Sequence, residues 1–338
     1  MRHLISYVIT RLLLAIPMIF IMMTLIFVVL RVMPGDPVSA VLGGHAPQQR
    51  IDEIREQLGL NKSLAAQYGD YLGQLVRLDL GESMVFKQSV SQVIVEKLPA
   101  TIELTFFSLL VSLGIGIPLG AYAAQRRRTG RDYSVRLYAN VVYCIPVFWM
   151  GLMLQLLFGV WLNWFPIAGR TGARVDISSF AHTGFYVIDT LRSGDIGAFA
   201  DVLWHLVLPS VTLGVVLSGI FVRLTRANML DVLKSDYILA ARARGIPERR
   251  VVYSHGLRNA LIPVVTMLGL QFSLLLAGAI LTESTFSWPG MGRLLLERIY
   301  LRDYPVIQGV IIVYTLIVSV VSLLVDLLYA AIDPRVKY

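Results

Sequence analysis

The sequence predicts an all-α, polytopic membrane protein with six transmembrane helices. Of its 338 residues, 56% are hydrophobic and only 15% are charged, whereas soluble domains carry about 25% charged residues. Six apolar stretches approach or exceed the length of about 20 residues that a helix needs to cross a bilayer. The basic side chains, which give a net charge of +8, gather in two of the loops between these stretches. This distribution indicates a membrane protein rather than a nucleic-acid-binding protein, so no nucleic-acid partner is expected.

The first apolar stretch lies between Arg11 and Arg31 and has 19 uncharged residues. A cleaved signal peptide is the alternative, but its apolar core would be shorter, so we expect a retained transmembrane helix. The polar segment that follows, 33–100, has apolar residues at helical spacing in two short runs. We therefore expect a small helical cap on the extracytoplasmic surface of the membrane.

Five further apolar stretches follow along the chain. They lie between Glu103 and Arg126, from about Leu137 to Leu162, between Asp201 and Arg223, between Arg258 and Glu283, and from about Pro305 to Ile332. The second span contains Gly114, Gly116, Pro118 and Gly120, residue types that favour close packing of membrane helices and tolerate a kink.

The distribution of charge orients these spans. The loops at 126–136 and 223–258 carry 13 of the 30 Lys and Arg residues and only four acidic residues. Because short basic loops remain in the cytoplasm, we expect both loops and both termini to be cytoplasmic. The predicted regions are a tail with the first span (1–32), an extracytoplasmic helical loop (33–100), a transmembrane core (101–332) and a cytoplasmic tail (333–338). Within the core, an extracytoplasmic loop covers about 164–205 and a cytoplasmic loop about 223–260.

The second cytoplasmic loop predicts a helix, a glycine turn and another helix. One face of the first helix collects residues at three- and four-residue steps: Leu230, Leu233, Tyr237, Ala240, Ala241 and Arg244. At Ala240 and Ala241 the side chains on this face are small, which permits close approach by a partner surface. Gly245 suits a left-handed helix end, and Pro247 suits the start of the next helix. An ordinary solvated loop is the alternative interpretation.

The pattern Ala240-Ala241-x3-Gly245 resembles the EAA loop of bacterial ABC importer permeases, which docks on ATPase subunits. The wider run DYILAARARGIPERRVVYSHGLRNALIPVV, together with SWPGMGR, RDYPVIQG and DLLYAAIDPRV, resembles the dipeptide and oligopeptide branch. Leu239 replaces the acidic residue of the general pattern, and Leu257-Arg258 stands at its terminal Leu-Pro; both departures are typical of the peptide branch. The resemblance implies the fold of a type I ABC importer permease.

The resemblance also implies partners. The chain would form half of a pore with a second homologous permease, surrounded by membrane lipid in the bacterial cytoplasmic (inner) membrane. Two ATPase subunits, which hold ATP and Mg, and an extracytoplasmic peptide-binding protein would complete the importer. The chain itself would bind no cofactor. The residues implied in coupling to the ATPase are Asp236, Tyr237, Ala240, Ala241, Arg242, Arg244 and Gly245.

The sequence lacks the motifs of an enzyme or a metal protein. It has no GxxxxGK[ST] loop, no GxSxG elbow and no metal-ligand spacing among its five histidines, so no catalytic residue and no metal site is expected. Ionisable groups inside spans are functional candidates, and Glu103, Glu283 and Asp326 are candidates for the pore or substrate path. The alternatives are hydration at the span ends for the two glutamates and a structural hydrogen bond for Asp326.

Two features are candidates for docking of the binding protein. Asp189 lies in the second extracytoplasmic loop, and the turn Trp288-Pro289-Gly290 lies between the last two spans. A rigid hairpin between the spans explains the turn equally well.

The second extracytoplasmic loop also bears on the substrate. TGFYVIDT, Asp201 and HLVLPS resemble the extended loop of dipeptide permeases, so we expect import of dipeptides. A nickel or glutathione importer is the nearest alternative. The alternative of another class is a secondary transporter. Proteins of that class typically have charged or unwound helices at mid-membrane and an internal repeat. The sequence shows neither.

Overall fold

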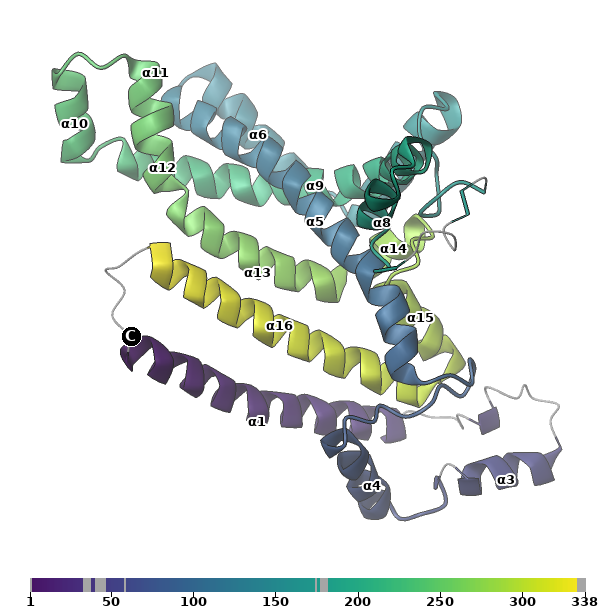
Figure 1. Cartoon of the computed structure of the whole chain (residues 1–338). Coiled ribbons are helices and arrows are strands. Elements are labelled where there is room, and N and C mark those ends of the chain that lie inside the picture. The colour runs from purple at the N-terminus through teal and green to yellow at the C-terminus, as the bar shows by residue number, and fades with distance from the viewer. Residues whose placement is uncertain are drawn as a thin grey trace. The chain divides into compact units, whose positions relative to one another are not determined.

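The computed structural model describes residues 2–32, 38–39, 47–57, 59–173, 175–176 and 182–332. The expected tail at 333–338 and parts of the loops expected at 33–100 and 164–205 lie outside the described residues. Within the described ranges the regular structure is helical, and extended backbone pairs only in an isolated bridge between Glu82 and Ser89. This confirms the predicted all-α class (Figure 1).

In the part of the chain that the structure describes, four helices are long and apolar enough to cross a membrane. They are α1 (Arg2–Val32), α5 (Val90–Gln125), α9 (Ile196–Val232) and α16 (Tyr304–Ile332). Two bent pairs of helices also qualify if each pair counts as one span, which gives up to six spans among the described residues. The predicted number of six agrees with this upper count.

The first bend falls where the sequence disfavours a helix. α6 (Gly130–Cys144) turns by 100° into α7 (Val147–Leu154) and the π-helical segment η1 (Gln155–Trp161). Pro146 lies between them, and the residue before a proline avoids the helical conformation, as Ile145 does with ψ 126°.

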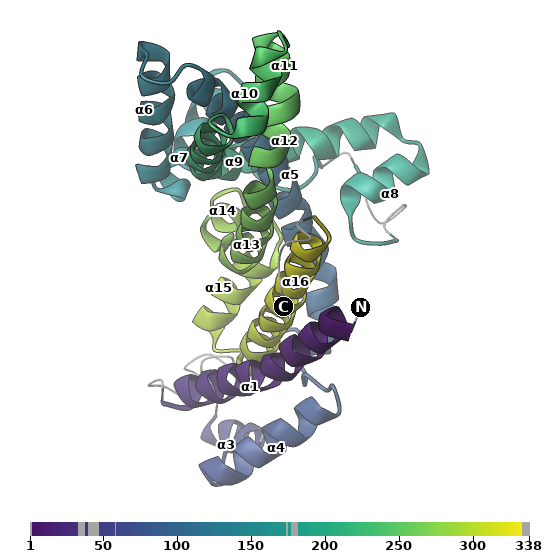
Figure 2. The same cartoon turned by 90° about the vertical axis from the view of Figure 1, so that its left-hand side faces the viewer.

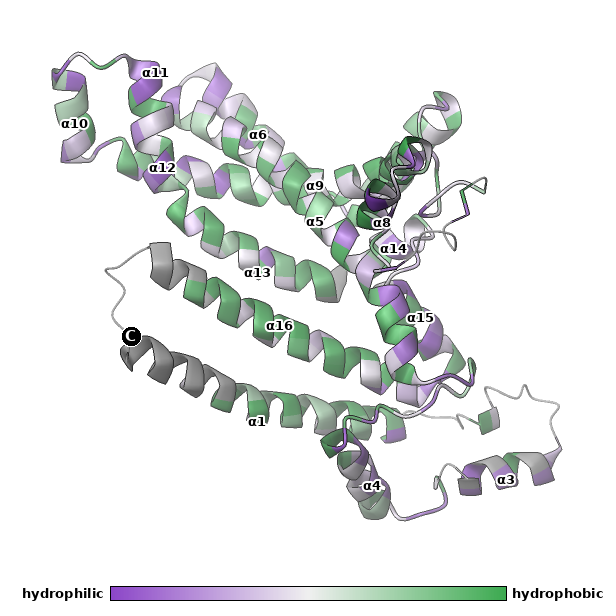
Figure 3. Cartoon of the chain, in the orientation of Figure 1, coloured by the Kyte–Doolittle hydropathy of each residue, from purple (hydrophilic) through white to green (hydrophobic). Residues whose placement is uncertain are grey.

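A second bend, of 49°, follows the cytoplasmic loop of the prediction. It separates α11 (Glu248–Arg250), the π-helical segment η3 (Val251–Gly256) and α12 (Leu257–Ala260) from α13 (Ile262–Gly278). Figure 3 shows that α13 and much of α16 are apolar along their length, whereas α11 is strongly polar.

The chain divides into two compact units, of which the first comprises residues 1–99 and 290–319. It contains α1, α3 (Gln48–Gln57), α4 (Leu64–Val76), α15 (Met291–Leu301) and the start of α16. Helices α3 and α4 are the short helices predicted within 33–100, and Figure 1 and Figure 2 show α4 beside α1. Phe27 of α1 packs against the rings of Tyr68 and Tyr71 on α4, at centroid distances of 5.1 and 5.7 Å.

A buried carboxylate organises the other side of this unit. Asp303 is fully buried and accepts a hydrogen bond of 2.5 Å from Ser83 Oγ and one of 3.2 Å from the Met84 N–H. Because a buried carboxylate is costly unless hydrogen-bonded, these bonds fix the segment after α4 onto the start of α16.

The second unit, residues 100–289 and 320–338, is built around α9. Small residues let neighbouring helices approach its backbone. A Cβ atom at Gly219 of α9 would lie 2.6 Å from the Ala139 carbonyl oxygen of α6, and one at Gly120 of α5 would lie 2.7 Å from Thr225 Cβ. Gly120 therefore serves the close packing that the glycines of the second span predicted.

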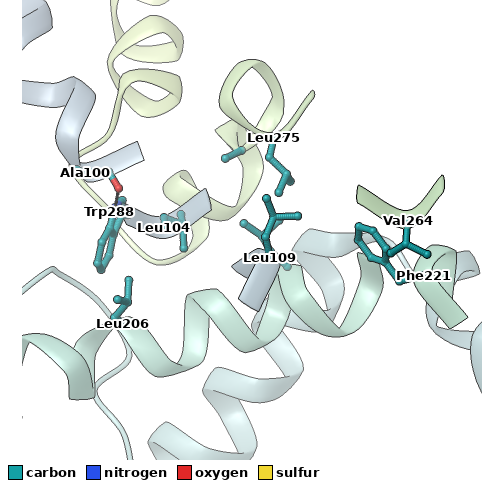
Figure 4. Close-up of a cluster of buried hydrophobic side chains, with 10 residues drawn as sticks. Ala100, Leu104, Leu109, Leu206, Phe221, Val264, Leu275 and Trp288 are labelled. Carbon is teal, nitrogen blue, oxygen red and sulfur yellow. Dashed lines mark hydrogen bonds between the residues drawn. The ribbon is translucent and has the colours of Figure 1, made fainter. Parts of the chain in front are cut away.

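The apolar core of the second unit joins α5, α9 and α13. Its buried members are Ala100, Leu104, Leu109, Leu206, Leu213, Phe221, Val264, Leu275, Ala279 and Trp288. Figure 4 shows the Trp288 indole pointing toward Leu206, with its Nε1–H directed at the Ala100 carbonyl. Because lipid tails are as apolar as these side chains, the core joins the long helices through close van der Waals packing rather than through removal of apolar surface from water.

Candidate functional site

The predicted coupling helix is a separate helix, α10 (Asp236–Ala243), rather than a continuation of α9. α9 ends at Val232, and Ser235 takes an extended conformation with φ −69° and ψ 152°. The Ser235 hydroxyl donates to the Val232 carbonyl at 2.6 Å, a local bond that competes with helix continuation. The single helix face expected from Leu230 to Arg244 is therefore wrong, because the chain turns at residues 233–235.

Gly245 ends α10 as predicted. Its φ of +73° is left-handed, a conformation that carries a steric cost for residues with a Cβ atom. The Gly245 N–H donates to the Arg242 carbonyl at 2.9 Å, and the Ile246 N–H donates to the Ala241 carbonyl at 3.3 Å. Pro247 lies immediately before α11, so the helix, glycine turn and second helix of the prediction are confirmed. Residues 236–250 are called the coupling segment below.

An ion pair spans the glycine turn. Arg242 donates from Nη2 to Glu248 Oε1 at 2.8 Å and from Nε to Oε2 at 3.1 Å. The hydrogen bonds that Arg242 donates to the Glu248 carboxylate raise the pKa of Arg242 above its ordinary value. Such exposed pairs stabilise a fold only slightly, but this one joins the last turn of α10 to the first residue of α11 at two points.

The two alanines of the motif are neighbours on α10 but differ in burial. Ala241 is 9% exposed and packs with Ile238 and Val251 in a buried apolar cluster. Ala240 is exposed. Ala240 is therefore the more accessible of the two alanines, and the docking of a partner on both of them stays a prediction.

The open side of α10 carries the remaining predicted residues. Tyr237, Ala240 and Arg244 follow one another at helical spacing and are all exposed, as are Asp236 and Arg242. The Tyr237 hydroxyl accepts a 2.6 Å hydrogen bond from Asn259 Nδ2, which holds the ring at this surface. The surface formed by Tyr237, Ala240 and Arg244 is called the outer face of α10.

A second polar constellation lies in the same unit, around Glu103 of α5. Arg170 Nη2 donates to Glu103 Oε2 at 2.5 Å, and the Val187 N–H donates to Oε1 at 2.9 Å. Both charged side chains are about 95% buried, at 5% and 4% relative exposure. The Arg170 guanidinium also stacks on the Tyr186 ring, 3.6 Å from its centroid. The sequence predicted Glu103 as a site residue but not Arg170. Because burying a carboxylate without a partner is costly, a buried Glu103 requires a cation beside it, and this requirement could have pointed to an arginine such as Arg170.

Of the other two candidates for the pore or substrate path, the structure describes the side chain of Glu283 but not that of Asp326. Glu283 is fully buried on α14 (Ile280–Thr285) and accepts a hydrogen bond of 2.6 Å from Thr101 Oγ1. Hydration at a span end therefore does not describe Glu103 or Glu283. The side chain of Asp326 lies outside the described residues.

The two features expected to dock a binding protein are mostly internal. Asp189, on α8 (Tyr186–Ser193), is buried and accepts hydrogen bonds from the N–H groups of Thr183 and Gly184 at 3.1 and 3.0 Å. Trp288 is fully buried, Gly290 is buried, and Pro289 is half-buried. This placement favours the rigid-hairpin interpretation of the Trp288-Pro289-Gly290 turn. Among the described residues, no three His, Cys, Asp or Glu side chains gather in a way that could hold a metal ion.

The comparisons with known proteins agree along the whole chain. The family described as "Binding-protein-dependent transport system inner membrane component" matches residues 116–338, and its N-terminal family matches residues 4–105. The chain is 42% identical to the "Di/tripeptide transport system permease protein DppB" of Pseudomonas aeruginosa (strain UCBPP-PA14), over 98% of this chain and 99% of that relative. It is 40% identical to the "Dipeptide transport system permease protein DppB" of Escherichia coli (strain K12), with the same two coverages.

A third relative carries a different substrate name. The "Glutathione transport system permease protein GsiC" of Escherichia coli (strain K12) is 39% identical over 98% of this chain and 99% of the relative. The family match confirms a multi-pass protein of the bacterial inner membrane and a transporter subunit rather than an enzyme. The chain belongs to the family of binding-protein-dependent transport system inner membrane components.

Proposed function

We propose that this chain is a permease subunit of an ATP-driven dipeptide importer and forms half of its pore. A second homologous permease, two ATPase subunits that bind ATP and Mg, and an extracytoplasmic peptide-binding protein complete the assembly. The observation that carries the proposal is the exposed outer face of α10, whose following glycine turn is spanned by the Arg242–Glu248 ion pair. It is supported by the 42% identity of the chain to a di/tripeptide permease.

The coupling segment is packed so that a push on it reaches the long helices. Ile238 and Ala241 of α10 pack on Val251 of η3. Next to them, Val252 of η3 clusters with Met229 near the end of α9. An ATPase subunit that displaces α10 would therefore displace α9 and, through η3 and α12, α13 as well, since closely packed elements move as one body.

The movement of α9 also extends to α6. Arg226 of α9 binds the buried carboxylate of Asp132 at two points, with Nε–Oδ1 at 2.7 Å and Nη2–Oδ2 at 2.8 Å. Tyr138 of α6 and Ser218 of α9 share a hydrogen bond of 2.8 Å. In the proposed mechanism α6 and α9 swing together when ATP binding closes the ATPase pair.

The proposed orientation places both termini and the coupling segment in the cytoplasm. In a Cys144→Ser background, Gln88→Cys is expected to react in intact cells with a membrane-impermeant maleimide, because it lies in the extracytoplasmic loop. Lys234→Cys, which is equally exposed, is expected to react only after the membrane is permeabilised. Labelling in the reverse pattern would show that the coupling segment cannot meet a cytoplasmic ATPase.

Substrate identity is tested by growth. A leucine auxotroph whose only peptide importer contains this chain is expected to grow on a leucine dipeptide, and deletion of the gene should abolish that growth. Growth on free leucine is the control and should not change. If the deletion instead abolishes glutathione or nickel uptake and leaves dipeptide use intact, the chain serves the alternative substrate.

A further inference from the structure

Five arginines gather within the second unit, where α5 ends and α6 begins. They are Arg126, Arg127, Arg128, Arg131 and Arg136, and all five are exposed. These five residues are called the arginine cluster below. The one acidic residue at positions 126–136 is Asp132, and it is 1% exposed. The surface of this turn is therefore strongly basic.

The carboxylate of Asp132 does not balance the cluster. Its two oxygens accept hydrogen bonds from Arg226 of α9 at 2.7 and 2.8 Å, and Oδ2 also accepts one from the Arg128 N–H at 3.0 Å. The charge of Asp132 is thus matched by an arginine from outside the cluster. Because like charges held close together repel one another, an anionic partner would stabilise the turn.

The turn holds the cluster in a defined backbone conformation. The Thr129 N–H and hydroxyl both donate to the Arg126 carbonyl, at 3.1 and 2.6 Å. Arg128 has a φ of +62°, a left-handed conformation that favours glycine. The backbone at position 128 therefore does not require an arginine, and the charge of this side chain needs another explanation.

The exposed side of α6 places the cluster at the surface of the membrane. Tyr133, Leu137 and Val141 follow one another at four-residue steps and are 59%, 64% and 49% exposed, so they form an apolar stripe on one helix face. The candidate span of α5 ends at Gln125, directly before the cluster. The Arg136 guanidinium carbon lies 5.7 Å from the Tyr133 ring centroid, so this side chain reaches back along α6 toward the turn, as basic side chains at span ends do.

The chemistry of the cluster and the stripe selects the partner. Guanidinium groups bind phosphate oxygens through paired hydrogen bonds, and four to eight basic residues beside a span attract anionic lipids. We propose that the arginine cluster binds the headgroups of anionic phospholipids, such as phosphatidylglycerol, whose acyl chains lie along the stripe. An acidic surface of an ATPase subunit is the competing partner, but it would leave the adjacent apolar stripe without a role.

The test measures the lipid selectivity of the whole complex, purified with its partner subunits and reconstituted in dioleoylphosphatidylcholine bilayers. Electron spin resonance of spin-labelled lipids gives the association of phosphatidylglycerol with the protein relative to that of phosphatidylcholine. We expect phosphatidylglycerol to associate at least about fivefold more strongly, since one basic residue at an anionic surface contributes about that factor. Arg127→Gln combined with Arg131→Gln should lower this preference by about fivefold or more.

Arg128→Gly separates the charge from the fold. Glycine suits the left-handed backbone at this position, so the unfolding temperature of the complex should not fall. The preference for phosphatidylglycerol should nevertheless fall about two- to fivefold. Lys87→Gly is the matched control, because Lys87 is also exposed and left-handed, with a φ of +51°, but lies outside the cluster. It removes one positive charge at the same kind of backbone position, and the lipid preference should not change.

Three results would overturn the proposal. The first is equal association of the two lipids with the unaltered complex, and the second is an equal loss of preference in Arg128→Gly and Lys87→Gly. The third is a pair of cluster variants that keep the preference for phosphatidylglycerol but release the ATPase subunits, which would show a protein contact instead. The lipid preference does not depend on the transported substrate, so this proposal and the growth test of dipeptide import can fail separately.

Discussion

Ala241→Glu is expected to unpack the coupling segment and abolish peptide uptake. The side chain is 9% exposed and faces Ile238 and Val251, so a carboxylate there would be buried without a partner. Such a charge costs about 3 kcal/mol or more. A helix as short as α10 has too little stability of its own to remain folded against that cost. Hydrogen exchange in the purified complex should show lost protection of the amides of residues 236–250, together with lost dipeptide uptake.

Ala240→Glu is the matched control, since it places the same charge on the adjacent residue at the outer face. Hydrogen exchange should be unchanged, because substitutions at exposed sites usually alter stability by no more than about 0.5 kcal/mol. Uptake should nevertheless fall, because the outer face is the proposed contact with the ATPase. Normal protection in Ala241→Glu would contradict the packing of α10, and normal uptake in Ala240→Glu would contradict the docking face.

Glu103→Gln is expected to lower the free energy of unfolding by about 3–5 kcal/mol, because it leaves the Arg170 guanidinium buried without its carboxylate. Arg170→Met should cost a similar amount for the reciprocal reason. The double variant should cost clearly less than the sum of the two, since it removes both charges from the interior. Denaturant unfolding of the four proteins in detergent gives the coupling energy directly.

Asp231→Asn is the control for this cycle. Asp231 pairs with Lys234 at 3.9 Å, and the two side chains are 82% and 62% exposed, so the change in unfolding free energy should stay within about 0.5 kcal/mol. Additive effects of the two buried substitutions would show that Glu103 and Arg170 do not depend on each other.

Local pattern alone determined much of this protein. Apolar composition and length predicted the membrane helices, because a span must satisfy its own backbone hydrogen bonds over about 20 residues. Gly245 predicted the end of α10, because a left-handed conformation favours a residue without a Cβ atom. Motifs in the coupling segment and near the C-terminus predicted the family, since they are contiguous in the chain.

Only the tertiary structure decided which side of each element is covered. Ala240 and Ala241 look alike in the sequence, and the packing of η3 against one side of α10 is what separates them. The partner of Glu103 lies 67 residues away in the chain, in a polar loop that carries no periodic signal. Trp288 looked like a surface turn because its neighbours are Ser, Pro and Gly, yet its indole fills the core above Leu206. Sequence periodicity predicts the conformation of a segment, whereas the burial of its side chains depends on which distant segment packs against it.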